Sequence, residues 1–457
     1  MFEVGLVNIS FMRALFVVGL LASTACTEKN PLFCAADSEC TTGRICDITG
    51  DFAGTSNVCI PTPDDCPVER CGCSPGEGFT CDGDQLTSCS ADGTSTVTST
   101  CALGCSTEAR CLSFEPSNGL NSAFVMAEHE PEIALPNGTR IDTTTGIVED
   151  ADGVAIPVTS SVIDQDGGSS IRVFVARSWV VDDVRVTGSR SMAFVAFESI
   201  TIRGVLDASA DTDLSGPGGQ EDPSVCVGVA TATAPGCTFS CTASGAGGGG
   251  NATSGGRGGS LTFPGGGLGG ALIPTFNPLV GGCRGGAFVV AAGPIAGGAG
   301  GGGLQLVAGS SVELTARGLI DLGGGGGQTS AGGGSGGTAV IEAPTVHFEG
   351  SATGFVANGG AGGGCGANGA DGTRTTFRAA APKCTDKSAG DGGTTSVPPQ
   401  AGQIKCTSGT CSSLGDQYGG GGGAVGRLMV ATRDGEFTVN GSPALSVVIT
   451  KTMLTPK

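Results

Sequence analysis

Residues 194–207 read FVAFESITIRGVLD, and residues 306–321 read LVAGSSVELTARGLID. Each stretch holds a short apolar run, a second run with apolar residues at alternate positions, an Arg-Gly corner and a closing Asp. The Phe-Val-Ala of 194–196 also stands at 174–176, 20 residues earlier. Repetition at this spacing is typical of units that stack and bury their apolar faces against one another.

Further copies of the pattern extend the repeat toward the C-terminus. They occupy 341–356 and 429–439, and 287–292 is expected to be part of another. Because side chains alternate along a strand, Val312 and Leu314 should point inward and Glu313 outward. The predicted fold class is mostly β: small disulfide-rich N-terminal modules, then an irregular right-handed parallel β-helix over 171–457 with glycine-rich insertions.

Glycine tracts separate the copies of the repeat. They run over 245–270, 297–303, 323–337, 359–372 and 419–423. Ordering a glycine segment carries a high entropic cost. Two arrangements remain open: flexible excursions from the corners of the repeat, or extended chains packed side by side in a polyproline-II-like form, which missing side chains permit.

The first 25 residues have the order of a secretory signal peptide. Arg13 precedes an apolar run at 14–21, and the small residues 22–25 lead to Cys26. Such a run is too short for an ordinary membrane helix. Met12 is a candidate start of translation, because residues 1–11 add nothing to the signal-peptide pattern. Residues 22–26 resemble a bacterial lipobox, which makes Cys26 the predicted lipidation site. Ser23 departs from that pattern, and cleavage after Ala25 by an ordinary signal peptidase is the alternative.

Cysteine parity favours the lipid assignment. The chain has 21 cysteines, so setting Cys26 aside leaves an even number. They divide into two even sets, each able to close its own bridges in an oxidising exported space. The disulfide candidates are Cys34, Cys40, Cys46, Cys59, Cys66, Cys71, Cys73, Cys81, Cys89, Cys101, Cys105 and Cys111, followed by Cys226, Cys237, Cys241, Cys283, Cys365, Cys384, Cys406 and Cys411.

These signals predict five regions. After the signal peptide (1–25) come a lipid-anchored Cys-rich module at 26–60 and a second Cys-rich module at 61–115. A polar connecting region at 116–170 precedes the β-helix at 171–457, which carries a disulfide-bearing insertion at about 375–418. Modules this short and this rich in cysteine depend on disulfides in place of a large core.

The Cys-rich segment with its turn at Cys81-Asp82-Gly83 and its closing Cys101–Cys111 loop resembles modules of glycine- and cysteine-rich cell-surface lipoproteins of myxobacteria and related Gram-negative bacteria. The resemblance covers about 80 residues and rests on spacing and turn chemistry. It implies an exported protein of the outer membrane or cell surface, held to the membrane through a lipid anchor, in which such modules act as spacers or binding knobs.

Charge and motif content limit the partners and metal ions that the chain is expected to bind. A net charge of −19 disfavours nucleic acid as a partner, because phosphates require basic surfaces. Asp150, Asp152, Asp164 and Asp166 are weak calcium candidates, since alternating carboxylates before a Gly turn can converge on a cation. Turn formation by Asp and Gly explains them equally well, so no cofactor and no firm metal site are predicted.

No catalytic residue is predicted. Arg203 and Arg317 recur at equivalent corners, each followed by an aspartate, Asp207 or Asp321. Recurrence in every copy is typical of turn geometry, whereas catalysis needs one special copy. His347 falls in an outward position, and His129 has no recognisable partner. The predicted function is a structural or adhesive surface lipoprotein that binds matrix, polysaccharide or another cell surface. The alternative is a polysaccharide lyase or hydrolase, which the β-helix architecture resembles.

Overall fold

The computed structural model describes residues 44–47, 58–61, 78–90, 95–233, 244–260, 266–290, 292–315, 317–384, 387–404 and 418–457. The chain divides into two compact units, one of Met1–Thr80 with Thr87–Ser99 and one of Cys81–Leu86 with Thr100–Lys457. Residues 1–25 and Cys26 lie outside the described residues, so the signal peptide and the lipid anchor remain predictions.

The N-terminal part contains short antiparallel strands. β1 (Arg44–Asp47) pairs with β2 (Val58–Pro61), which places Cys46 opposite Cys59. β3 (Gly78–Asp82), β4 (Gln85–Cys89) and β5 (Thr96–Thr100) form a three-stranded sheet. In the second unit, disulfides join Cys81 to Cys105 and Cys101 to Cys111.

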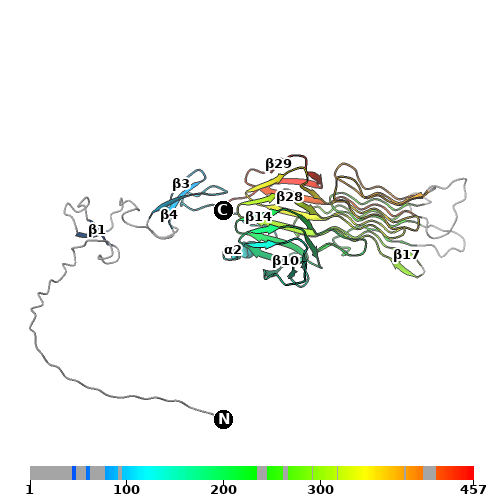
Figure 1. Cartoon of the computed structure of the whole chain (residues 1–457). Coiled ribbons are helices and arrows are strands. Elements are labelled where there is room, and N and C mark those ends of the chain that lie inside the picture. Colours follow the sequence, from blue (N-terminus) through cyan, green and yellow to red (C-terminus); the bar gives the residue numbers. More distant parts are fainter. Residues whose placement is uncertain are drawn as a thin grey trace, which may run out of the picture. The chain divides into compact units, whose positions relative to one another are not determined.

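Three large sheets dominate the described part of the second unit (Figure 1). The first has the order β31 (Val448–Met453), β28 (Arg427–Thr432), β22 (Thr338–Glu342), β19 (Gly303–Ala308), β13 (Ser191–Ala196), β10 (Gly168–Ala176), β9 (Thr159–Gln165). The second has the order β29 (Thr438–Asn440), β23 (Thr345–Glu349), β20 (Ser311–Leu314), β14 (Ser199–Ile202), β11 (Trp179–Val181), β6 (Ile133–Leu135). The third has the order β30 (Ala444–Ser446), β24 (Gly354–Val356), β21 (Leu319–Asp321), β15 (Val205–Asp207), β12 (Val184–Thr187), β7 (Thr139–Asp142), β8 (Ile147–Glu149).

Neighbouring strands in these sheets are parallel, except for the antiparallel pairs β9–β10 and β7–β8. The mostly β, parallel part of the prediction is therefore confirmed. The repeats align as the sequence indicated: Phe174 pairs with Phe194, and Phe194 with Leu306. Parallel pairing also reaches back to β6 and β7, so it begins inside 116–170, which we expected to be only a polar connection.

One hydrophobic core takes side chains from all three sheets. Phe194 packs against Phe174 and Trp179, with ring centroids 6.1 and 4.6 Å apart. The Trp179 indole N–H donates to the Val195 carbonyl at 3.1 Å. Val312 and Leu314 are fully buried, whereas Glu313 between them is half-buried, as strand alternation predicts.

The outer face of the first sheet has a smaller core of its own. There α2 (Asn121–Ala127) buries Ala123, Phe124 and Ala127 among residues that include Val195 and Val307. α2 is the one helix among the described residues, and the sequence patterns did not predict it. It is not long and apolar enough to cross a membrane.

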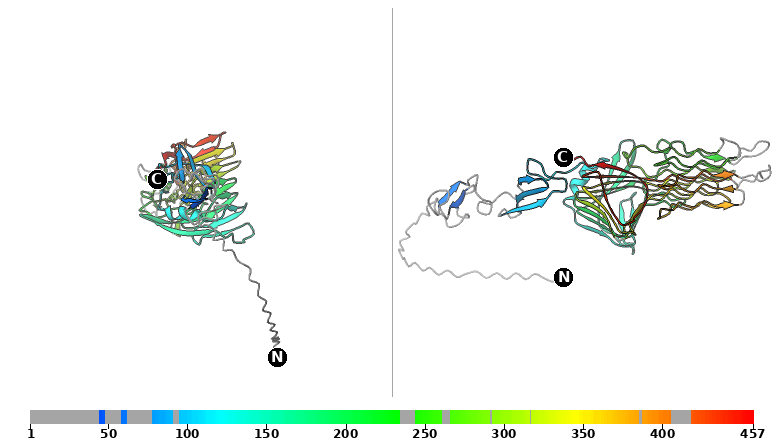
Figure 2. Two further views of the ribbon diagram at one scale, coloured as in Figure 1. Left: turned by 90° about the vertical axis from the view of Figure 1, so that its left-hand side faces the viewer. Right: turned by 90° about the horizontal axis from the view of Figure 1, so that it is seen from above.

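The glycine tracts pack side by side rather than forming loose excursions. We call this assembly the glycine bundle; its tracts are 244–250, 255–259, 266–270, 281–286, 297–302, 323–327, 332–337, 359–363, 390–393 and 419–426. They run alongside one another away from the sheets (Figure 2, right). Of the two arrangements that the sequence left open, the structure has the second.

Hydrogen bonds in the glycine bundle repeat every third residue. The N–H groups of Gly245 and Gly248 donate to the carbonyls of Gly259 and Gly256, both at 2.8 Å. Ala246 and Gly249 donate to Ser330 and Gly333 at 3.0 and 2.8 Å, and Gly247 donates to Ala230 at 3.1 Å. A period of three residues is that of the polyproline II helix. Each tract is thus joined to neighbours in three directions.

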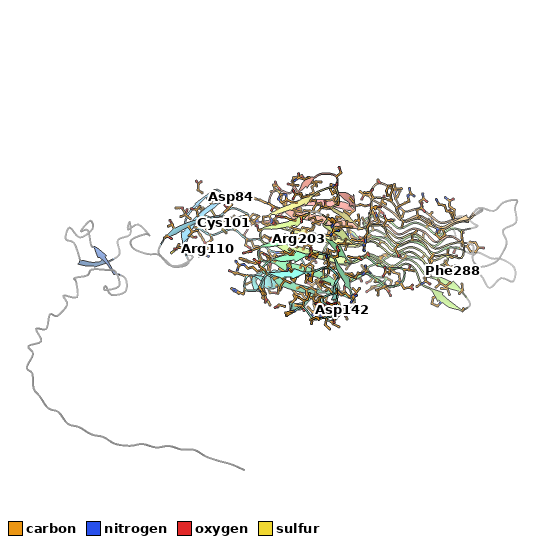
Figure 3. The ribbon with its side chains drawn as sticks, viewed as in Figure 1. Asp84, Cys101, Arg110, Asp142, Arg203 and Phe288 are labelled. Atoms are coloured by element: carbon orange, nitrogen blue, oxygen red, sulfur yellow. A yellow bond between two sulfur atoms is a disulfide. The ribbon has the colours of Figure 1, made fainter. Side chains whose placement is uncertain are left out.

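The close spacing of the tracts explains why glycine is required. A Cβ atom on Gly248 would lie 2.0 Å from the Gly422 carbonyl oxygen, and one on Gly423 would lie 1.9 Å from that of Gly334. The tract positions 245–250 are all buried. Figure 3 shows Phe288 at the end of the glycine bundle remote from the sheets, while Arg203 lies on the sheets themselves.

Two small sheets border the glycine bundle. β16 (Ala232–Thr233), β17 (Phe288–Val290) and β18 (Gly293–Ile295) form one of them. The expectation that 287–292 belongs to a further copy of the repeat is therefore wrong, because β17 pairs with β16 and β18 rather than with the large sheets. β25 (Lys383–Cys384), β26 (Lys387–Ser388) and β27 (Gln403–Ile404) form the second small sheet, within the predicted insertion.

Candidate functional site

A row of charged residues crosses neighbouring strands of the third sheet. Arg140 on β7 pairs with Arg185 on β12, Arg185 with Asp207 on β15, and Asp207 with Asp321 on β21. Parallel pairing stacks equivalent positions from successive strands, so all four residues fall in one row. Leu206 is fully buried while Asp207 keeps some exposure, which places Asp207 on the outer side of the sheet.

Arg374 joins the two aspartates of this row. Its Nη2 lies 2.6 Å from Asp207 Oδ2, and its Nε lies 2.9 Å from Asp321 Oδ2. Arg185 contacts the other oxygen of Asp207, with Nη1 at 2.7 Å from Oδ1, and the Ser209 hydroxyl donates to the same oxygen at 2.6 Å. One guanidinium therefore serves two carboxylates, and Asp207 is held from both sides.

The two carboxylates differ in acidity. Burial raises the pKa of Asp321 to about 6, and the nearby charge of Asp207 adds to this, while the Gly323 N–H and Arg374 oppose it. Burial alone would also raise the pKa of Asp207, but hydrogen bonds from Ser209 and the charge of Arg185 outweigh it and hold that pKa below its usual value. At neutral pH both groups carry negative charge, and Asp321 is the one that takes up a proton first on acidification.

A cavity of about 390 Å³ opens beside the row, and we call it the arginine–aspartate cavity. Its lining residues are Gly138, Thr139, Arg140, Asp183, Val184, Arg185, Val205, Asp207 and Arg374. Arg140 is exposed, and within the described part of the chain it takes part in no ion pair. Its N–H donors are thus available to a ligand.

The lining contains both hydrogen-bond donors and hydrogen-bond acceptors. Three arginines supply N–H groups, and the carboxylates of Asp183 and Asp207 accept. Asp183 is held in place because its Oδ1 accepts the Val205 N–H at 2.8 Å. Hydroxyl groups both donate and accept, so this lining suits a ligand that carries several of them, and the cavity volume lies in the range of small-molecule sites.

The same geometry argues against Asp321 as an acid–base catalyst. Its side chain is 2% exposed, and it is not part of the cavity lining. A general acid must come within hydrogen-bond reach of the ligand atom that it protonates. Asp321 does not line the cavity. It holds Arg374 in place through their ion pair.

The sequence predicts part of this row. Asp207 and Asp321 recur at equivalent positions of the repeat, and they are paired on neighbouring strands. Arg203 and Arg317, noted with them, are exposed and lie outside the cavity lining. The arginines that do contribute were missed: Arg374 is separated from Asp207 by 167 positions, and its insertion shows no repeat that would align it with the sheet.

The cysteine predictions are supported wherever side chains are described. Cys226 and Cys283 form a disulfide, in addition to Cys81–Cys105 and Cys101–Cys111, and Cys89 and Cys365 are also disulfide-bonded. Cys46, Cys59 and Cys384 lie in strands of which only the backbone is described. Outside the described residues lie Cys34, Cys40, Cys66, Cys71, Cys73, Cys237, Cys241, Cys406 and Cys411.

Three of the four calcium candidates, Asp150, Asp152 and Asp166, lie in or beside turns, and Asp164 is a strand residue. Asp150 Oδ1 accepts the N–H groups of Asp152 and Val154 at 3.0 and 2.9 Å. Asp164 lies in β9, and Asp166 follows that strand in a turn. Among the described residues no group of three or more His, Cys, Asp or Glu side chains is arranged to hold a metal ion.

The histidines do not join the cavity. His347 pairs in register with Glu313 and Thr438, the outward position predicted for it. His129 follows α2 and is exposed.

No family model matches this chain, and neither a curated protein nor a solved structure matches it.

Proposed function

We propose that this chain is a cell-surface adhesive lipoprotein that holds a saccharide unit of a matrix or envelope polysaccharide in the arginine–aspartate cavity. The observation that carries the proposal is the lining: Arg140 is exposed and has no ion pair among the described residues, and it lies beside Arg185 and Asp207, which are themselves fixed by ion pairs. Donors and acceptors at fixed positions favour binding of sugar hydroxyls, because little side-chain ordering is needed on association.

Export supports this role. Disulfides such as Cys81–Cys105 and Cys226–Cys283 persist in oxidising compartments outside the cytosol. The signal-like residues 1–25 and Cys26 agree with export and lipidation, as in the surface lipoproteins of Gram-negative bacteria that the Cys-rich segment resembles. Intact-mass measurement of the mature N-terminus tests the anchor: a diacyl or triacyl mass on Cys26 supports it, and a free N-terminal cysteine contradicts it.

The proposed scaffold is a right-handed parallel β-helix. Support comes from the order of the strands, since each repeat contributes one strand to the first, second and third sheets in turn. Parallel strands in one sheet are joined almost always by right-handed connections. A crystal structure in which the connection from β13 through β14 and β15 to β19 winds left-handed would contradict this arrangement.

A glycan array with the purified full chain tests the binding role. We expect durable binding to at least one polysaccharide class, reduced tenfold or more in affinity by Arg140→Ala. Arg203→Ala is the matched control, because Arg203 is also an exposed arginine of the repeat but lies outside the cavity lining. Equal losses in both variants, or no retained glycan at all, would contradict the proposal.

A second candidate function is a carbohydrate-active enzyme. The observation in its favour is that the carboxylates of Asp183 and Asp207 both line the cavity, within reach of a bound sugar. Release of reducing ends or unsaturated sugars from a bound polysaccharide, abolished by Asp207→Asn, would favour the enzyme. Binding without turnover favours the adhesive protein.

A further inference from the structure

A second cavity, of about 420 Å³, lies on the outer face of the first sheet. We call it the Glu342 cavity. It is formed where the segment before α2 meets the end of the chain, and its lining residues are Glu115, Pro116, Ser117, Gly119, Asn121, Glu342, Met429, Ala431, Thr452, Met453, Leu454, Thr455 and Lys457. It shares no lining residue with the arginine–aspartate cavity.

Glu342 supplies a buried carboxylate to this cavity. The residue is 5% exposed. The Ser117 N–H donates to its two oxygens at 3.1 and 3.2 Å, and Gln305 Nε2 donates to Oε2 at 2.7 Å. These neutral donors hold the carboxylate in one position. They do not neutralise it, and among the described residues Glu342 has no ion pair.

An uncompensated buried charge is unfavourable, so a cation that reaches it gains more than a neutral ligand of the same shape. Burial raises the pKa of Glu342, so a proton competes with a cation for this carboxylate, and an ammonium group bound there takes the place of the proton. A carboxylate accepts up to four hydrogen bonds, and the protein donors account for three contacts. A further N–H donor can therefore be accommodated.

The remaining walls define the shape of the cation. Met429, Met453 and Leu454 contribute apolar surface to the lining. At the cavity's other carboxylate, the ammonium group of Lys457 contacts Glu115. Glu342, in contrast, has no cationic partner among the residues that the structure describes.

We infer that the Glu342 cavity binds a small primary alkylammonium ion, with the ammonium group on Glu342 and the alkyl chain against Met429 and Leu454. The net charge of −19 attracts cations to the protein in general. The apolar surface of Met429, Met453 and Leu454 favours an alkylammonium over a metal ion, because a metal ion gains nothing from contact with an alkyl wall. The inference does not depend on saccharide binding at the other cavity.

Titration of the full chain with n-butylammonium chloride, followed by calorimetry, tests the site. We expect saturable binding at one site, with n-butanol and sodium chloride giving no saturable signal. Nα-acetyl-lysine methylamide is a second probe; binding of it as tight as that of n-butylammonium indicates a lysine side chain of a partner, and weaker binding indicates a free amine. Equal response to n-butylammonium and n-butanol overturns the inference.

Two variants locate the site. Glu342→Gln removes the charge and is expected to lower the affinity for n-butylammonium tenfold or more, whereas Glu349→Gln, an exposed carboxylate on β23, should change it less than twofold. Met429→Trp fills the cavity with Glu342 intact and should abolish binding. Circular dichroism confirms that each variant is folded. Unchanged binding in folded Glu342→Gln or in folded Met429→Trp contradicts the site.

Discussion

Asp207 and Asp321 are directly paired on the neighbouring parallel strands β15 and β21, and the single guanidinium of Arg374 bridges them. Like charges at paired positions repel each other. The bridge relieves this repulsion, and it ties a residue of the insertion to the third sheet.

The stability of the protein should depend on the ionisation of Asp321. Its pKa is raised to about 6 from an unfolded-state value of 3.8, so folding takes up a proton between these pH values. The free energy of unfolding therefore falls as pH rises through this window, by about 3 kcal/mol from this group, since one pKa unit corresponds to about 1.4 kcal/mol. Denaturant unfolding at pH 4 to 7 should show a smaller fall for Asp321→Asn than for the natural protein. An unchanged pH dependence would show that another group is responsible.

Removal of Arg374 should destabilise the protein most at neutral pH. Arg374→Ala leaves Asp207 and Asp321 facing each other, but the Arg374 side chain is 52% exposed, so we expect a loss of about 2 kcal/mol rather than the full cost of breaking a buried ion pair. The loss should shrink below pH 6, where Asp321 is protonated. Arg203→Ala, at an exposed corner, should stay within about 0.5 kcal/mol of the natural protein. A loss that does not vary with pH argues against the bridge.

A methyl group inside the glycine bundle should not be tolerated. The Cβ of Gly423→Ala would lie 1.9 Å from the Gly334 carbonyl oxygen and 2.4 Å from its carbon, both backbone atoms. We expect a loss of about 3 kcal/mol or failure to fold, from overpacking. Gly259→Ala, whose nearest atom is at 3.2 Å, is the milder comparison in the same bundle. Circular dichroism during urea unfolding measures both, and equal stabilities would contradict the packing described here.

The Cys226–Cys283 disulfide should protect the glycine bundle from proteolysis. It closes a loop with a sequence separation of 57, for which the chain-entropy model gives about 4 kcal/mol. The Cys226→Ser/Cys283→Ser variant should be cut within 225–290 by a protease under conditions that leave the natural chain intact, as mass spectrometry of the fragments would show. In Cys101→Ser/Cys111→Ser, whose disulfide spans a separation of only 10, that region should stay resistant.

Arg427 should be replaceable by an apolar residue. It is 4% exposed, stacks at 4.6 Å from the Phe276 ring centroid, and its Nη2 has no hydrogen-bond partner in the described part of the chain. Burial lowers the pKa of Arg427 to about 10, so it remains charged at pH 7. Arg427→Met is expected to raise the free energy of unfolding by about 1 kcal/mol, because no buried charge remains. Arg427→Lys keeps the charge and should not; a clear loss in the Met variant would mean that the hydrogen bonds from Nη1 to the Ile273 carbonyl and from Nε to Thr338 outweigh the cost of burying the charge.

The repeat could be predicted because its signal is local and recurs. The matching runs at 194–207 and 306–321 set the register of β13, β14 and β15 against β19, β20 and β21. The prediction for 287–292 was wrong because it rested on one short apolar run, and such a run does not identify its partner strand. Phe288–Val290 pairs instead with a strand outside the repeat.

The candidate sites could be predicted only in part. Asp207 and Asp321 stand at equivalent positions of the repeat, and so recurrence brought them to attention. Arg374 and Glu342 come from positions whose role depends on contacts across long stretches of chain, which periodicity does not encode. α2 was missed because its seven residues are too few to show a helical period against the polar residues around them.

The three-way hydrogen bonding of the glycine tracts has a mechanical consequence. A pull on one tract, such as 244–250, is passed at successive residues to three different neighbours. When a tract is pulled along its length, the hydrogen bonds to the tracts beside it are loaded in shear and share the tension. Extension therefore requires many of them to break together. The glycine bundle is therefore expected to resist stretching through backbone hydrogen bonds rather than through the side-chain packing that other protein cores use.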